Sequence, residues 1–157
     1  MASLKYLFSL PARWLHRRGF GIQSPWAYEI VRDALFDTNH FYAFEKLNGD
    51  STDEQLFRLV HKARPNCVYL ISPRKHSVDY VRAARSSANV IVLKVILLEN
   101  LPEFAQDSCV IIENIDKANA AVWQSFVKSP IVTTSFEMRT RGIAFFDKAR
   151  QKQNYLL

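Results

Sequence analysis

Hydrophobic positions along the chain follow helical spacing first and then fall into strand-like runs. Trp26, Ile30 and Leu35 recur at helical spacing directly after Ser24 and Pro25. Ser24 can cap the first turn of a helix, and proline is well suited to the first helical position. The pattern therefore predicts a helix that begins at Pro25 and buries one apolar face.

A second helix is predicted after residue 50. Ser51 and Glu54 have the spacing of a capping box, in which each side chain bonds a free backbone amide of the first turn. Leu56 and Val60 then lie on one face of the predicted helix, which should end before Pro65.

Strands and helices alternate from residue 67 onward. The expected strands are 67–71, 89–98 and 107–115, and the expected helices are 77–85 and 116–128, the second capped by Asp116. The continuous apolar runs are typical of strands in a sheet that is covered on both faces. This regular alternation of strands and helices is typical of an α/β fold with a parallel sheet.

The end of the chain has a different pattern. Segments 131–136 and 142–146 are separated by a short polar stretch, which predicts an antiparallel hairpin, and 154–157 could add an edge strand. We therefore expect a three-layer α/β sandwich with a mostly parallel sheet and a C-terminal hairpin. In a single domain, 1–64 would form a helical lead-in and 65–157 the α/β core.

Length and composition agree with one folded domain. The chain has 157 residues, of which 48% are hydrophobic, enough for one sizeable core and unlike a disordered chain. Its longest apolar run, from Val90 to Leu98, is broken by Lys94, so we expect no membrane span. Pro11 interrupts the apolar start and no small-residue cleavage site precedes the basic stretch 13–18, which argues against a signal peptide.

Cysteine and histidine usage gives little sign of redox or metal chemistry. Cys67 and Cys109 each lie in an apolar, strand-like run, where we expect them to be core residues in a reducing cytoplasm. A disulfide is the less favoured alternative. No cysteine or histidine spacing matches a zinc site, so no metal is expected. Surface or core roles are also favoured for all four histidines, His16, His40, His61 and His76.

Segments near both ends of the chain carry a family resemblance. They are 19–28 (GFGIQSPWAY), 41–45 (FYAFE), 56–60 (LFRLV), 116–123 and 132–157. Together they resemble a Bacteroidetes family of class I S-adenosylmethionine-dependent methyltransferases. This resemblance implies a Rossmann-like methyltransferase fold, here in reduced form.

The middle of the chain departs from this family where the cofactor would bind. The loop after the first parallel strand of such folds is rich in glycine, because the backbone must approach the cofactor closely. Here Leu70 replaces the acidic residue that the resemblance implies, and Ser72 and His76 lie near the glycine positions. Lys94 lies where a carboxylate would bind the ribose, and a lysine can only donate.

Further departures follow along the chain. Between Val95 and Asp107 the chain lacks a portion that family members have, so the sheet should be smaller. Glu113 and Asn114 lie near the paired acidic residues of the family and could keep a polar role, although helix capping or solvent exposure is favoured. The vestigial cofactor site would thus comprise Ser72, Arg74, His76, Lys94, Glu113 and Asn114.

These departures favour a degenerate methyltransferase, a pseudoenzyme that serves as a binding or scaffold module. It would have no catalytic residues and no cofactor, and would dock onto another protein or onto itself. The first alternative is an active methyltransferase that binds S-adenosylmethionine in a divergent site. The second alternative is a basic nucleic-acid-binding module.

The net charge of +6 is the basis of the nucleic-acid alternative. Its contacts would come from the cations Arg13, Arg17, Arg18, Arg74, Lys75, Arg82 and Arg85, with Trp14 and Tyr80 as stacking residues. Arg74, Lys75 and His76 could also bind an anion at a helix start, although a solvated basic loop is favoured.

The N-terminal segment is amphipathic. Leu4, Leu7, Phe8 and Leu15 could enter a membrane surface while basic residues face the headgroups, but Pro11 weakens this interpretation. Packing of the same apolar residues against the domain, or against a second copy, is preferred.

Overall fold

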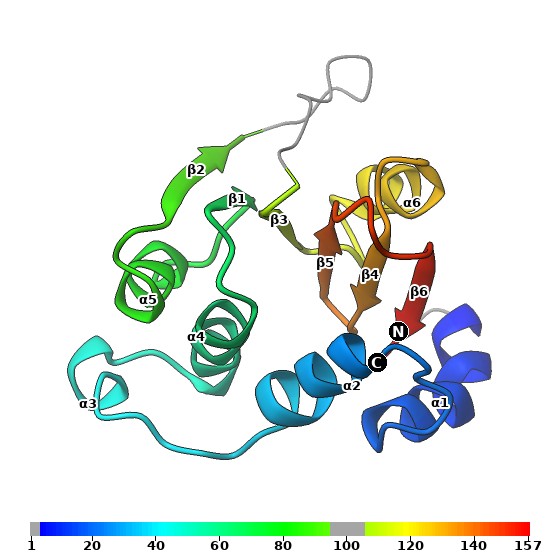
Figure 1. Ribbon diagram of the computed structural model, residues 1–157, viewed down its shortest axis with the longest axis horizontal. Coiled ribbons are helices and arrows are strands. Elements are labelled where there is room, and N and C mark those ends of the chain that lie inside the picture. Colours follow the sequence, from blue (N-terminus) through cyan, green and yellow to red (C-terminus); the bar gives the residue numbers. More distant parts are fainter. Residues whose placement is uncertain (1–3, 95–105) are drawn as a thin grey trace.

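The computed structural model describes residues 4–94 and 106–157 and has an α/β architecture (Figure 1). The helices are α1 (Leu4–Arg17), α2 (Pro25–Ile30), the π-helix η1 (Val31–Leu35), α3 (Phe44–Leu47), α4 (Ser51–Ala63), α5 (Ser77–Ala84) and α6 (Ala120–Lys128). The strands are β1 (Cys67–Ile71), β2 (Asn89–Leu93), β3 (Ser108–Glu113), β4 (Thr134–Glu137), β5 (Arg141–Phe145) and β6 (Gln153–Leu156). The predicted α/β class is confirmed.

The six strands form one mixed sheet in the order β2-β1-β3-β5-β4-β6. β1 pairs in parallel with β2 and β3, and β4 pairs in parallel with β6, whereas β5 runs antiparallel to both β3 and β4. The predicted C-terminal hairpin is therefore confirmed as β4 and β5, and the predicted edge strand is β6. The second half of the expected strand 89–98, and most of the region from Val95 to Asp107, lie outside the described residues.

Helices cover both faces of the sheet, as the continuous apolar runs predicted (Figure 1). β3 is buried along its whole length, whereas β2 at the edge of the sheet is not. Alternate residues point to opposite faces, so Val68 and Cys109 join one core cluster with Leu59 of α4. Val110 on the other face packs against Trp123 of α6. The arrangement is consistent with a three-layer α/β fold.

Two helix starts differ from the prediction. Ser24 caps α2 as expected, because its side chain accepts from the amide of Ala27. The capping box of α4, however, uses Asp50 and Asp53, so the predicted Ser51–Glu54 box is wrong by one residue. Asp116 does not cap α6, which begins at Ala120 after a turn.

The segment that precedes α2 is also helical. Pro11 lies inside α1 and does not interrupt it. Gly19 and Gly21 then adopt φ values of +85° and +77°, in a turn that returns the chain toward the sheet. α1 packs beside the edge strand β6, at the periphery of the molecule (Figure 1). The helix packs on the domain, but the expected packing of its apolar residues against the domain is wrong for Phe8 and Leu15, which are exposed.

The cysteines lie on neighbouring strands. Cys109 is completely buried, as predicted, whereas Cys67 at the start of β1 is only half-buried. Both are free thiols. In the described part of the chain, none of the helices is long and apolar enough to cross a membrane.

Candidate functional site

The carboxyl ends of β1 and β3 meet at one edge of the sheet, where open α/β folds bind ligands. The residue after β1 is Ser72, with φ of +53°, and the residue after β3 is Asn114, with φ of +58°. Both are left-handed conformations that glycine adopts more readily. Polar side chains therefore project from this edge where a cofactor-binding loop would present bare backbone.

Asn119 joins the two loops at this edge. Its side-chain Nδ2 donates to Ser72 Oγ at 3.0 Å and to the carbonyl of Glu113 at 2.6 Å. Its backbone amide donates to the carbonyl of Asn114. These bonds occupy the Asn119 side chain, so it does not cap α6. The space between the loops is thus bridged by a side chain of the protein.

Glu113 and Arg141 form a buried ion pair beneath this bridge. They lie opposite each other on β3 and β5, and only 5% and 2% of their surface is exposed. Arg141 Nε donates to Glu113 Oε1 at 2.6 Å, and Nη1 donates to the carbonyl of Thr52 at 2.9 Å. The pair therefore links the centre of the sheet to the first turn of α4.

Arg74 is held by two aspartates at the start of α4. Its guanidinium pairs with Asp50, and its Nε lies 3.8 Å from Asp53 Oδ1. The hydrogen bond from Arg74 lowers the pKa of Asp50 below its ordinary value, and Asp50 raises the pKa of Arg74 in return. Arg74 is therefore paired with acidic side chains of the protein, while its neighbour Lys75 is exposed, as expected for a solvated basic loop.

The structure gathers some of the predicted site residues and separates others. Ser72, Arg74 and Glu113 lie at the carboxyl edge. His76 is half-buried at the start of α5 and makes no side-chain capping bond, and Lys94 is exposed after β2. Asn114 is exposed, so the favoured alternative holds for it. Glu113 follows neither favoured alternative, because it pairs with Arg141 in the core.

Four residues of this edge were missed by the sequence analysis, namely Asp50, Asp53, Asn119 and Arg141. Only Arg141 left a signal, because it is a charged residue directly before the apolar run 142–146. If a charge at such a position is buried it needs a partner, which Glu113 supplies on the neighbouring strand.

These residues do not fit S-adenosylmethionine. The one carboxylate at the end of β3, Glu113, is occupied by Arg141, and the exposed group after β2 is the cation Lys94. The cofactor's ribose hydroxyls need acceptors at such a position. Asn119 and Ser72 also bond to each other across the two loops instead of presenting backbone.

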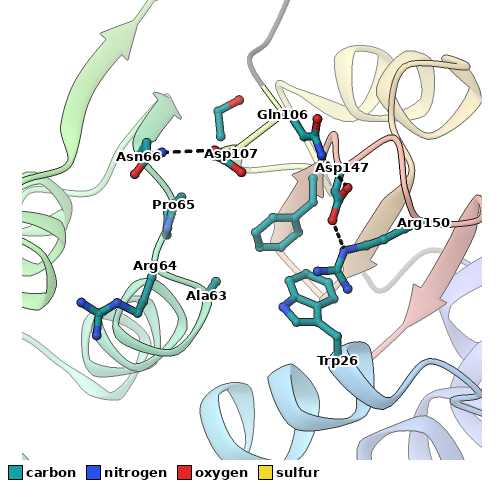
Figure 2. Close-up of a pocket in the computed structure, with 11 residues that line it drawn as sticks. Trp26, Ala63, Arg64, Pro65, Asn66, Gln106, Asp107, Asp147 and Arg150 are labelled. Atoms are coloured by element: carbon teal, nitrogen blue, oxygen red, sulfur yellow. Dashed lines mark hydrogen bonds and ion pairs between the residues drawn. The ribbon is translucent and has the colours of Figure 1, made fainter.

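A cavity of about 120 Å³ lies at the opposite, amino edge of β1 and β3, between Trp26, Asn66 and Asp147 (Figure 2). Its polar groups bond one another: Asn66 with Asp107, and Asp147 with Gln106 and Arg150. The amide of Ala149 lowers the pKa of Asp147 by hydrogen bonding. This volume is well below the roughly 300 Å³ at which small-molecule sites begin.

A wider, shallow cavity of about 370 Å³ lies at the amino ends of β4 and β6. It is lined by polar residues that include Gln23, Thr134 and Gln153. The ligand sites of open α/β sheets lie at the carboxyl ends instead. Both cavities are thus on the wrong edge for a retained cofactor site.

Comparisons with known proteins do not identify a family for this chain. Neither protein-family models, nor curated proteins, nor solved structures give a match to the chain. Within residues 4–94 and 106–157, no three histidine, cysteine or acidic side chains are grouped to hold a metal ion.

Proposed function

We propose that this chain is a reduced, Rossmann-like methyltransferase fold that works as a non-catalytic binding or scaffold module in the cytoplasm. The observation that carries the proposal is the closure of the carboxyl edge by the protein's own side chains. Glu113 is paired with Arg141, Asn119 bridges two loops, and Arg74 is held by Asp50. Two free cysteines agree with a reducing compartment.

The fold assignment is supported by the sheet itself. The parallel strands β1, β2 and β3 are followed by a C-terminal hairpin whose strand β5 is antiparallel to its neighbours. This is the arrangement that the family resemblance implies. The module would use its surface to bind a protein partner, while the site of the ancestral chemistry became part of the core.

The nucleic-acid alternative is weakened by the positions of its own residues. Arg13 is buried and paired with Glu137, and Arg74 is paired with Asp50. Tyr80 is fully buried and its hydroxyl accepts from the amide of Gly49, so the ring cannot stack on a base. Lys75 and Arg82 remain exposed.

Calorimetric titration with S-adenosylmethionine and S-adenosylhomocysteine tests the proposal. We expect no saturable heat and no increase of the melting temperature at millimolar ligand, since a ligand that binds the native state must stabilise it. Saturable binding at micromolar ligand, which corresponds to a binding free energy of about −8 kcal/mol, would overturn the proposal in favour of the active enzyme.

A control variant shows whether any bound S-adenosylmethionine lies at the carboxyl edge of the sheet. Asn119→Leu removes the donor that bridges the loops and leaves a bulky side chain between them. Micromolar binding that is lost in this variant would place the ligand at the carboxyl edge, against the proposal. A small heat of binding that is equal in the unchanged protein and in the variant would be non-specific and would agree with the proposal.

A further inference from the structure

α1 packs against the rest of the protein through its polar side. Arg13 is 4% exposed, and its Nη1 donates to the carbonyls of Glu137 and Leu157 at 2.9 and 2.8 Å. Its Nη2 pairs with the Glu137 carboxylate at 2.6 Å. His16 Nδ1 lies 2.9 Å from the carbonyl of Leu156. These bonds fix the helix on the end of β4 and on β6.

The apolar side of α1 faces solvent as a result. Phe8 is 81% exposed, and Leu10, Trp14 and Leu15 are all exposed, as is Phe20 in the turn that follows. Phe8 and Leu15 are two helical turns apart and therefore lie on one face. A surface helix normally turns this face toward the core, and a group of exposed large apolar side chains marks an interaction site.

The surroundings of this face are cationic. Residues 1–28 contain Lys5, Arg13, Arg17 and Arg18 but neither aspartate nor glutamate. Arg17 and Arg18 are exposed at the end of α1, and the Arg18 guanidinium lies 4.0 Å from the Trp14 ring.

Two carboxylates on elements near α1 are already paired with cations, and half-buried Asp37 after η1 accepts hydrogen bonds from Asn39. Asp33 of η1 lies 3.2 Å from Lys62 Nζ, and Glu137 of β4 is paired with Arg13. The exposed Arg17 and Arg18 contact the Phe36 and Trp14 rings, at 5.3 and 4.0 Å, and ring contacts of this kind leave the charge available for an external anion.

We propose that the outer face of α1, formed by Phe8, Leu10, Trp14 and Leu15 with Arg17 and Arg18 at its end, docks onto an anionic phospholipid surface. A bilayer interface takes up the apolar side chains, and its phosphates pair with the arginines. Aromatic side chains such as Trp14 favour the headgroup level.

Charge decides between the membrane and a second copy of the chain. Two α1 helices that met through this face would bring their arginines together, and residues 1–28 offer them no carboxylate. An anionic surface supplies the missing charge. The proposal goes beyond the scaffold function and is independent of whether the chain binds S-adenosylmethionine.

Vesicle co-sedimentation of the full chain tests the proposal. We compare vesicles of phosphatidylcholine alone with vesicles of equal parts phosphatidylcholine and phosphatidylglycerol. Binding is expected only to the anionic vesicles and should weaken as salt is added, because salt screens the surface potential. Trp14, which is exposed in the free protein, should give a blue shift of tryptophan emission on binding.

Two double variants separate the apolar and the charged contributions. Phe8→Gln with Leu15→Gln, and Arg17→Gln with Arg18→Gln, should each lower vesicle binding by about tenfold or more. The matched control is Tyr42→Gln with Ile131→Gln, since Tyr42 is 71% exposed and Ile131, like Leu15, is 43% exposed. The control should bind as the unchanged protein does.

Three results would overturn the proposal. The first is that the protein does not bind anionic vesicles, and the second is that the control variant loses as much vesicle binding as the two double variants. The third is that the protein does not bind vesicles but forms a dimer in sedimentation velocity, and that the Phe8 and Leu15 changes dissociate this dimer. Thermal melting shows whether each variant is folded. We expect unchanged melting temperatures, because the substituted side chains face solvent.

Discussion

Glu113 and Arg141 show what a single buried residue can decide in this protein. Each charge is tolerated in the core only because the other is present, at 2.6 Å. Glu113→Gln leaves the Arg141 charge without a counterion, so the free energy of unfolding should fall by about 3 kcal/mol or more. Urea denaturation of the purified variant measures this loss.

A double variant isolates the interaction from simple loss of packing. Glu113→Gln with Arg141→Met removes both charges, and a buried pair that is replaced by neutral groups often costs little. We expect the double variant to be more stable than Glu113→Gln alone. A single variant that loses under about 1 kcal/mol would contradict a buried, coupled pair.

At the scale of one element, the start of α4 combines a helix cap with an ion pair. Asp50 accepts from the amides of Thr52 and Asp53 and also pairs with Arg74. Asp50→Asn keeps a capping side chain but loses the charge, so it should cost under about 1 kcal/mol at neutral pH. Asp50→Ala also loses the cap and should cost about 1 kcal/mol more.

The pH dependence of the same variants has a definite sign. Arg74 lowers the pKa of Asp50 from 3.8, so the pair stabilises the fold at every pH above 3.8. The contribution is lost as the pH falls through the lower, folded-state pKa. The difference in stability between the unchanged protein and Asp50→Asn should therefore be constant above pH 3.8 and vanish in stronger acid. A difference that grows in acid would exclude this pairing.

The contact between β5 and α6 depends on one glycine. A Cβ atom at Gly142 would overlap the ring of Trp123, which is 1% exposed. Gly142→Ala should therefore destabilise the protein by about 1–3 kcal/mol through overpacking, measured by thermal unfolding. Trp123→Leu makes room, so the double variant should lose less than the sum of the two single variants. Additive losses would mean that the ring moves aside freely.

Local signals in the sequence predicted elements that depend on neighbouring residues. The strand 67–71 and the Ser24 cap were confirmed because apolar runs and capping side chains act over a few residues. The Ser51–Glu54 box was wrong because Asp50 and Asp53 fit the same pattern one residue earlier. Arg74 pairs with this Asp50 and is distant in the sequence.

Contacts between distant residues had no such signal. Arg13 and Glu137 are 124 positions apart, so their bond could not be predicted, although it determines which face of α1 is buried. Helical spacing shows that α1 is amphipathic, but it does not show which side packs. The predicted packing of its apolar face against the domain was wrong for Phe8 and Leu15, which are exposed, whereas packing against a second copy stays a prediction. The side chains of Leu4 and Leu7 lie outside the described residues.

At the scale of the molecule, Glu137 links α6, on one face of the sheet, to α1, beside the edge strand β6. One carboxylate oxygen pairs with Arg13 of α1, and the other accepts from Trp123 Nε1 of α6 at 2.9 Å. Peripheral α1 is thus connected to the interior through one strand end. A rigid attachment of this kind would hold the outer face of α1 ready for docking without refolding.

Cys109 offers a probe of global opening. It lies on β3 in the middle of the sheet, is fully buried, and burial raises the pKa of its thiol well above the usual range. Because the thiolate is the reactive form, a disulfide reagent should modify Cys109 only when the sheet opens. Half-buried Cys67 should react first in the native protein.

Single-cysteine variants make this assignment testable. In Cys67→Ser, the remaining thiol should be labelled at a rate that follows global unfolding, rising with urea as the unfolded population does. Adding Gly142→Ala to this variant should speed labelling about tenfold for each 1.4 kcal/mol of stability lost. If Cys109 reacted at the same rate with and without Gly142→Ala, the sheet would open locally around β3, and the central strands would not form one cooperative unit.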